Sequence, residues 1–339
     1  MTTDLVLAEI DPDDDAALRS WFDLRRVVDA VDLPGDPPNS WALHVGRLRH
    51  PWPGSEHRAF LAHRGGDAVG WVALSLPMTE NRTTAQLDLQ VLPAYRGQGL
   101  GRALLAVATQ LAADLGRSRL MAEATGEDAW AFATAVGATC ALVDTERRLD
   151  LTTLDEAALG RLHAEAVRNS HGYSLLQWAG PTPDQHLGAV AALESRMSTD
   201  APMDDLQWDQ EVYDDDRLRA RDSVLARRGA RPFTTVVRHD ATDRVVGETL
   251  LVVSSDVPQA ANQWATIVEP EHRGHRLGLL LKIANLRQLM SREPAVTTIG
   301  TWNADSNVAM LRVNVAMGFT AVRRWGEWEL VLPRSAATA

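Results

Sequence analysis

Residues 91–105 read VLPAYRGQGLGRALL, with three glycines and two arginines between an apolar, strand-like segment and an apolar, helix-like one. Residues 268–282 read VEPEHRGHRLGLLLK and keep the same spacing. Arg273 follows Arg96 by 177 positions (273 − 96), and the same offset joins Gly247 to Gly70 in an upstream segment. Because the repeat reaches beyond one loop, we expect a folding unit that is present twice in the chain.

Each half shows the same order of elements, with several alternating, strand-like segments first and helical patterns later. This order predicts an α+β fold, with a mixed, mainly antiparallel sheet and flanking helices. We expect an N-terminal domain at 1–152, a linking helix at 153–170 and a C-terminal domain at 171–339. Within the second domain, the region 170–230 is expected to form a first strand and lid-like helices.

Composition narrows the classes of function. The net charge is −11 over 339 residues, with acidic runs at 11–15 and 213–216, so nucleic acid is not expected as a partner. Cys140 is the only cysteine, which excludes an intramolecular disulfide and a cysteine-based zinc site. No apolar run is long enough to span a membrane, and the N-terminus has no basic, apolar leader. We therefore expect a cytoplasmic protein without a membrane partner.

The glycine-rich stretch is suited to binding an anion. A strand that turns directly into a helix leaves backbone N–H groups at the positive end of the helix dipole. Gly97, Gly99 and Gly101 allow close approach, and Arg96 and Arg102 add charge, so a pyrophosphate fits better than a single carboxylate. No G-x-x-x-x-G-K-[ST] motif occurs, and the order R-G-x-G-x-G after several strands disfavours a Rossmann site.

At residues 96–101, RGQGLG, the chain resembles the GNAT superfamily of acyl-CoA-dependent N-acyltransferases, whose pyrophosphate loop follows [QR]-x-x-G-x-[GA] after the fourth strand. The resemblance covers nearly the whole chain as two tandem copies. It implies acetyl-CoA, or another acyl-CoA, as cofactor, bound by the loop and by the edge of the strand before it. The cofactor-binding residues that it implies are Leu89, Gln90, Val91, Arg96, Gly97, Gln98, Gly99, Leu100, Gly101 and Arg102 in the first copy, and Thr266, Ile267, Val268, Arg273, Gly274, His275, Arg276, Leu277, Gly278, Asn303 and Asn307 in the second.

The family usually takes its thiolate proton donor from a tyrosine in a pattern such as N-x-x-A-x-x-x-Y-x-x-x-G-F. Residues 307–319, NVAMLRVNVAMGF, keep the register but place Asn314 at the tyrosine position. Ala133 holds that position in the first copy, whose glycine loop is the more complete one because Arg276 replaces the middle glycine in the second. Asp88 and Glu248 are the candidate bases. The asparagines favour the second copy as the catalytic one.

The leading hypothesis is an N-acetyltransferase that moves an acyl group directly from acyl-CoA to a small-molecule amine, with one domain catalytic and the other degenerate. Two alternatives stay open, namely a non-catalytic acyl-CoA sensor or scaffold and a protein N-acetyltransferase. Because two units in one chain can replace the dimer of single-unit relatives, we expect a monomer with a pseudo-dimeric pair of domains.

Overall fold

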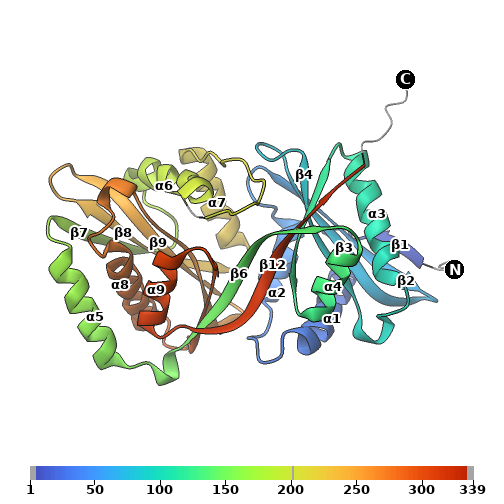
Figure 1. Cartoon of the computed structure of the whole chain (residues 1–339), viewed down its shortest axis with the longest axis horizontal. Helices are drawn as coiled ribbons and strands as arrows, with labels where there is room; N and C mark the ends of the chain where they lie inside the picture. Colours follow the sequence, from blue (N-terminus) through green and yellow to red (C-terminus); the bar gives the residue numbers. More distant parts are fainter. Residues whose placement is uncertain (1–4, 201, 334–339) are drawn as a thin grey trace. The chain divides into compact units, whose positions relative to one another are not determined.

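The computed structural model describes residues 5–200 and 202–333 (Figure 1). The chain divides into two compact units. Unit 1 comprises Met1–Val143 together with Trp325–Ala339, and unit 2 comprises Asp144–Arg324. Each unit contains a sheet with helices on both faces, and each is described separately below.

The sheet of unit 1 has the strand order β1-β2-β3-β4-β5-β12. Its strands are β1 (Leu5–Glu9), β2 (Ser55–Arg64), β3 (Asp67–Pro77), β4 (Thr84–Val91) and β5 (Arg119–Thr125), followed by the C-terminal half of β12 (Thr320–Val331). Its helices are α1 (Asp15–Asp32), α2 (Trp41–Arg49), α3 (Leu100–Asp114) and α4 (Glu127–Ala135), with a 3₁₀ turn η1 (Pro93–Tyr95) before the glycine loop.

Alternation along β3 separates the two cores of unit 1. Val72, Leu74 and Leu76 face a cluster that includes Leu100 and Leu104 of α3. Trp71, one residue out of phase and fully buried, faces α1 and α2 instead. This two-residue period is that of a strand buried on both faces, and it places α3 on one face of the sheet and α1 with α2 on the other. Figure 1 shows these helices around the sheet of unit 1.

The sheet of unit 2 has the order β6-β11-β10-β9-β8-β7. Its strands are the second half of β6 (Thr139–Asp150), then β7 (Tyr173–Ala179), β8 (Ala230–His239), β9 (Arg244–Ser254), β10 (Val257–Val268) and β11 (Thr298–Ala304). Its helices are α5 (Glu156–Asn169), α6 (Leu187–Asp200), α7 (Asp215–Arg227), α8 (Leu277–Arg292) and α9 (Val308–Met317), and its 3₁₀ turns are η2 (Leu151–Thr153), η3 (Asp184–His186) and η4 (Pro270–His272). Buried residues of α8 lie in one core with Phe233, Leu251 and Ile299, whereas α6 and α7 pack with Val236 on the other face.

Each unit closes its sheet with a strand from a distant part of the sequence. Trp325–Val331 of β12 pairs antiparallel with Arg119–Thr125 of β5, so the end of the chain completes unit 1. Asp144–Asp150 of β6 pairs with Thr298–Ala304 of β11 in unit 2. The sequence repeat does not predict this exchange. A repeat shows that two segments are alike, but it does not show which strand each of them pairs with.

The fold agrees with the predicted α+β class. In each unit the pairings are antiparallel except for β4 with β5 and β10 with β11, which are parallel. The helix α2 was not predicted, because its short segment WALHVGRLR has a weak apolar stripe. Within residues 5–200 and 202–333, no helix combines the length and the apolar character that a membrane span requires.

Candidate functional site

The two glycine loops have the same backbone conformation. Gly97 and Gly99 have φ of +73° and +79°, and their counterparts Gly274 and Arg276 have φ of +89° and +55°. Arg276 therefore holds the left-handed conformation that glycine holds in unit 1, at a steric cost of about 1 kcal/mol for a side chain with a Cβ. Arg276 stands where the first loop has Gly99, and the second loop nevertheless keeps the same backbone shape.

Both loops leave room and donors for a ligand. A Cβ built on Gly97, Gly99 or Gly274 meets no atom within 4 Å, so the space above the loop is open. The helices α3 and α8 begin directly after these loops and have no side-chain cap on their N-termini. Leu100 and Leu277 point into the core, 3% and 2% exposed, so only their backbone can serve a ligand. Free amides at a helix N-terminus fit the pyrophosphate of an acyl-CoA.

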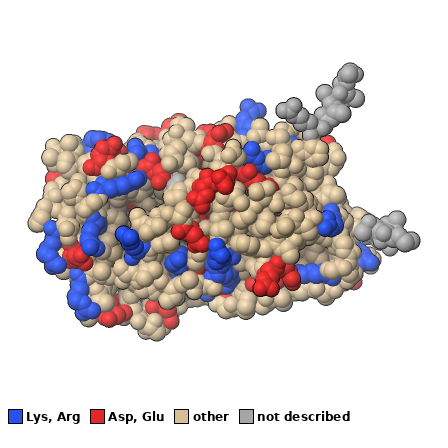
Figure 2. Space-filling model, in the orientation of Figure 1, with Lys and Arg blue, Asp and Glu red and all other residues tan. Residues whose placement is uncertain are grey.

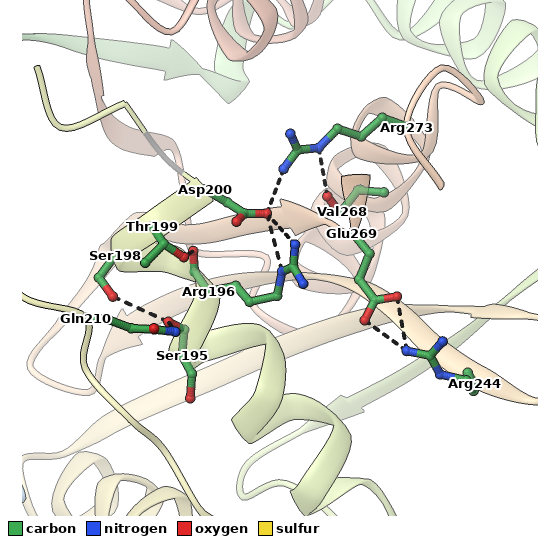
Figure 3. Close-up of polar contacts among 10 residues, drawn as sticks. All are labelled: Ser195, Arg196, Ser198, Thr199, Asp200, Gln210, Arg244, Val268, Glu269 and Arg273. Atoms are coloured by element: carbon green, nitrogen blue, oxygen red, sulfur yellow. Dashed lines mark hydrogen bonds and ion pairs between the residues drawn. The ribbon is translucent and has the colours of Figure 1, made fainter. Parts of the chain in front are cut away.

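The first arginine of each loop binds protein groups. Arg96 donates from Nε to the carbonyl of Val91 at 3.0 Å and from both Nη atoms to Asp32 at 2.7 and 2.6 Å. Arg273 likewise donates to the carbonyl of Val268 at 3.0 Å and to Asp200 at 2.9 Å. Figure 3 shows that Asp200 of α6 also accepts a hydrogen bond from Arg196. Each arginine therefore ties the end of the preceding strand to the end of a helix, as a brace for the loop.

Other predicted loop residues are also held by the protein. Gln98 accepts a hydrogen bond from Arg64 at 2.7 Å, and Arg102 donates to the carbonyl of Ala135 at the end of α4. In unit 2, Arg276 forms an ion pair with Glu165 at 2.8 Å. His275 lies beside Tyr173, whose hydroxyl is 2.9 Å from Nδ1 of His272. Arg102 and Arg276 therefore already bind protein groups. The backbone amides of each loop are left as hydrogen-bond donors for a phosphate.

The parallel strands separate directly before each loop. In unit 1, β4 and β5 pair only from Thr84 with Arg119 to Gln86 with Met121, although both strands continue. The edge of β4 that carries Leu89, Gln90 and Val91 stays paired with β3 on its other side. Unit 2 repeats this, because β10 and β11 pair only from Ala260 to Asn262, and an irregularity between Gln263 and Thr266 precedes Thr266–Val268. An open strand edge can pair with the amides of a pantetheine arm.

Charged residues stand at the separation in unit 1. Asp88 and Glu123 each lie two residues beyond the last paired residues, Gln86 and Met121. Arg25 of α1 donates to Asp88 at 2.6 Å. Burial works to raise the pKa of Asp88, but the charges of Arg25 and Arg47 lower it below its usual value. Asp88 is therefore ionised and committed to an ion pair.

The pKa of Glu123 is shifted in the opposite direction to that of Asp88. Burial raises the pKa of Glu123 above its usual value, and this effect exceeds the opposing effects of Arg47 and of a hydrogen bond with Glu327. Its side chain nevertheless keeps exposed surface. Glu327 lies directly opposite on β12. A solvent-accessible carboxyl with a raised pKa is suited to accept a proton near neutral pH.

Glu248, the candidate base of unit 2, is almost completely enclosed. It is 1% exposed, and its Oε1 has no hydrogen-bond partner among the described residues. Burial first, and then the carboxylate of Glu194, hold the pKa of Glu248 well above its usual value. Arg221 binds Glu194 and also Asp222, at 3.1 Å. Glu248 occupies the position of the buried Trp71 in unit 1, facing α6 and α7, and a substrate amine cannot reach it without a rearrangement.

The asparagines of unit 2 make hydrogen bonds that hold α9 in place. Asn314 is 0% exposed and donates from Nδ2 to Oδ1 of Asn303 at 2.6 Å, which joins α9 to β11. Asn307 caps the N-terminus of α9 through the amide of Met310. The register that the sequence showed is thus kept, but Asn314 lies in the interior, where it holds the helix in place.

Sequence reasoning missed four polar residues of unit 1, namely His44, Arg47, Glu123 and Glu327. Glu123 and Glu327 alternate with apolar neighbours in their strands, which is also the pattern of a solvent-facing carboxylate. The arrangement became visible only through the register of β5 with β12. The sequence did contain one signal, because Glu123 follows the apolar run Leu120–Ala122.

The geometry described so far, with paired anion loops and separated parallel strands in an α+β unit, is that of an acyl-CoA-dependent transferase. A family model described as Acetyltransferase (GNAT) family matches residues 28–138. A tandem GNAT protein from the clavulanic acid biosynthesis pathway, solved without acetyl-CoA, is 30% identical over 98% of this chain and 99% of its own, with a TM-score of 0.82. The chain belongs to the GNAT acetyltransferase family, in its tandem form, and is an acyltransferase.

Two more distant structures share the fold alone. A GCN5-related N-acetyltransferase from Sphaerobacter thermophilus is 13% identical, covering 97% of this chain and 96% of its own, with a TM-score of 0.68. The N-myristoyltransferase of Saccharomyces cerevisiae, solved with bound myristoyl-CoA, is 9% identical over 97% of this chain and 83% of its own, with a TM-score of 0.60. No curated protein matches the sequence.

Proposed function

We propose that the protein transfers an acetyl group from acetyl-CoA to the amine of a small molecule, and that unit 1 performs the chemistry. The observation that carries this proposal is the position of Glu123, exposed where β4 and β5 separate, in the unit whose loop keeps Gly97, Gly99 and Gly101. Unit 2 has a loop of the same shape, but its candidate groups Asn314 and Glu248 are enclosed. In this proposal, unit 2 is the degenerate domain and retains a structural or cofactor-holding role.

In a direct transfer, different residues of unit 1 have different roles. The amides that follow Gly97 and Gly99 hold the pyrophosphate, and the open edge of β4 from Leu89 to Val91 orients the pantetheine arm. When bound, acetyl-CoA supplies the activated acyl group. Glu123 accepts the proton from the attacking ammonium, directly or through one water, so that the free amine becomes the nucleophile.

A raised pKa suits Glu123 to this step better than the lowered pKa of Asp88. Asp88 instead fixes Arg25 and contributes negative charge beside the amine. Ala133 stands where the family places its acid, so no side chain at that position protonates the thiolate. The thiolate of CoA is a good leaving group, and the second proton that the attacking nitrogen loses as the amide forms can reach it through water.

The test is to supply acetyl-CoA and a panel of small amines and to follow both the release of CoA thiol and the mass of the acylated product. Thiol release that depends on the amine supports the proposal. Binding of acetyl-CoA without amine-dependent release would instead identify a sensor or scaffold. Acylation of basic peptides but of no small amine would identify a protein N-acetyltransferase. Sedimentation at micromolar concentration checks the accompanying expectation of a monomer.

A further inference from the structure

A second set of polar side chains lies on α1 and α2, which pack on one face of the sheet of unit 1. Arg25 of α1 and His44 and Arg47 of α2 all interact electrostatically with Asp88. Arg25 is neutralised by Asp88 at 2.6 Å and by Asp29 at 3.3 Å. His44 and Arg47 have no such partner, and they belong to neither of the loops described above.

His44 presents an unused ring nitrogen to this set. The residue is 7% exposed, and Nε2 has no hydrogen-bond partner among the described residues. Its ring packs on Trp21 with centroids 4.0 Å apart, which fixes the orientation. Burial, assisted by the charges of Arg25 and Arg47, lowers the pKa of His44 to about 3, so the ring is neutral. A buried polar nitrogen without a partner costs roughly 1–3 kcal/mol, a cost that a ligand can remove.

Arg47 is a guanidinium without a counterion. Within residues 5–200 and 202–333 no carboxylate forms an ion pair with it, whereas Arg49 on the same helix pairs with Asp15 at 2.5 Å. Burial first, and then repulsion from Arg25, lower the pKa of Arg47. Its side chain retains exposed surface. An arginine that is unpaired and accessible to solvent is suited to bind a carboxylate or another small anion.

Two carboxyl groups, opposite in charge to Arg47, lie on β5 and β12. Glu123 and Glu327 face each other on adjacent strands, and Glu123 is within electrostatic reach of Arg47. The two carboxyl groups and Asp88 favour a cationic group beside Glu123, while Arg47 favours an anionic one. A ligand that carried only an amine would leave Arg47 without a partner.

We propose that unit 1 selects an acceptor that carries both an amine and a carboxylate, with Glu123 and Glu327 binding the amine and Arg47, beside His44, binding the carboxylate. The inference rests on the proposed function and adds a substrate class to it, namely the amino acids and short amino-carboxylates. Glu327 then joins the site from the C-terminal strand, so the exchanged strand β12 is needed for recognition of the acceptor.

The experiment compares matched acceptors. The full-length protein receives acetyl-CoA with each of the twenty protein amino acids, β-alanine and 4-aminobutyrate, and separately with the amine that each would give on loss of its carboxylate. We expect kcat/KM for the preferred amino-carboxylate to exceed that of its matched amine at least tenfold. Arg47→Gln should remove most of this preference by raising KM, whereas the control Arg49→Gln on the same helix should leave it intact. Arg47→Lys should restore part of it.

The outcomes separate the inference from the function beneath it. Turnover of the amines equal to that of the amino-carboxylates leaves the proposed function standing and overturns the inference. A preference for carboxylates that Arg47→Gln leaves unchanged, in a variant whose melting temperature is that of the wild type, also overturns it. If neither series releases thiol although acetyl-CoA binds, the proposed function and the inference both fail.

Discussion

Glu123 and Glu327 lie directly opposite each other on β5 and β12, although they come from different ends of the chain. Their strands belong to unit 1, and Glu123 interacts electrostatically with Asp88 and Arg47. Burial raises the pKa of Glu123, whereas the hydrogen bond with Glu327 favours its ionised form and partly offsets that rise. The chemistry that we assign to unit 1 depends on this pair.

Glu123→Gln is expected to lower kcat of acyl transfer by about 10²-fold or more, because a general base typically contributes that factor. The affinity for acetyl-CoA should not change, since the loop is untouched. In the wild type the rate should rise with pH as Glu123 loses its proton, with a midpoint above the usual value for glutamate. Stopped-flow thiol release across pH measures this, with Glu56→Gln, an exposed carboxyl on β2, as control. An unchanged profile in Glu123→Gln would assign the base to another group.

Asp32→Asn distinguishes a brace from a phosphate ligand. If Arg96 braces the loop, loss of its bidentate partner should lower the free energy of unfolding by about 1 kcal/mol and weaken acetyl-CoA binding, because the loop loosens. If Arg96 were instead a ligand held back by Asp32, the substitution would free it and tighten binding. Calorimetric titration together with urea unfolding decides between the two.

Gly70→Ala tests how closely the backbone of β4 approaches Gly70, one of the glycines that the sequence repeat relates. A Cβ at Gly70 would lie 2.3 Å from the carbonyl oxygen of Gln90, and one at Gly247 would lie 2.8 Å from that of Ile267. Because both contacts are with backbone, we expect each substitution to lower the free energy of unfolding by roughly 1–3 kcal/mol, more for Gly70 than for Gly247. Gly160→Ala in α5, where a Cβ meets no atom within 4 Å, should be neutral or stabilising by up to about 1 kcal/mol. Equal effects at Gly70 and Gly160 would contradict the predicted crowding.

Lys282 is the only lysine in the chain, and it is 2% exposed in α8, with Nζ 5.2 Å from the ring centroid of Phe319. Burial lowers the pKa of Lys282 to about 7. Between pH 7 and its ordinary value of 10.5, the unfolded state binds the proton that the folded state has lost. Stability should therefore rise with pH in this window, by up to about 1.4 kcal/mol per pH unit from this group.

Lys282→Met should lack that rise and should be more stable than the wild type below pH 7, where the buried charge forms in the wild type. Lys282→Arg, which keeps a charge at every pH, should be less stable throughout. Urea unfolding from pH 6 to 9.5 measures all three proteins. The same slope in the wild type and in Lys282→Met would contradict the lowered pKa.

Much of the fold could be predicted from the sequence because local signals were strong. The offset between Arg96 and Arg273 identified both loops, and the structure gives both the same conformation. Gly70 and Gly247 were recognised as a repeat, and the close backbone approach explains why both are glycine. Acidic and basic side chains are interspersed on the face shown in Figure 2.

The candidate site was less predictable because it depends on register and burial. Asn314 stood in the position of a catalytic tyrosine, but whether that position faces a ligand or the interior depends on how α9 packs against β11. Glu248 appeared as a strand carboxylate, and its enclosure results from α6 and α7, whose placement has no local signal. The roles of Glu123 and Glu327 required the exchange of β12 between units, which no short pattern encodes.

The most direct test of the central claim adds one negative charge to one loop at a time. Gly99→Asp and Gly274→Asp place a carboxylate against the pyrophosphate, and Gly99→Asn and Gly274→Asn are uncharged controls that tolerate the same left-handed backbone. Acetyl-CoA binding and amine-dependent thiol release are measured for all four. We predict that Gly99→Asp loses turnover while Gly99→Asn and both Gly274 variants retain it. Loss of turnover in Gly274→Asp alone would contradict the account and assign the chemistry to unit 2.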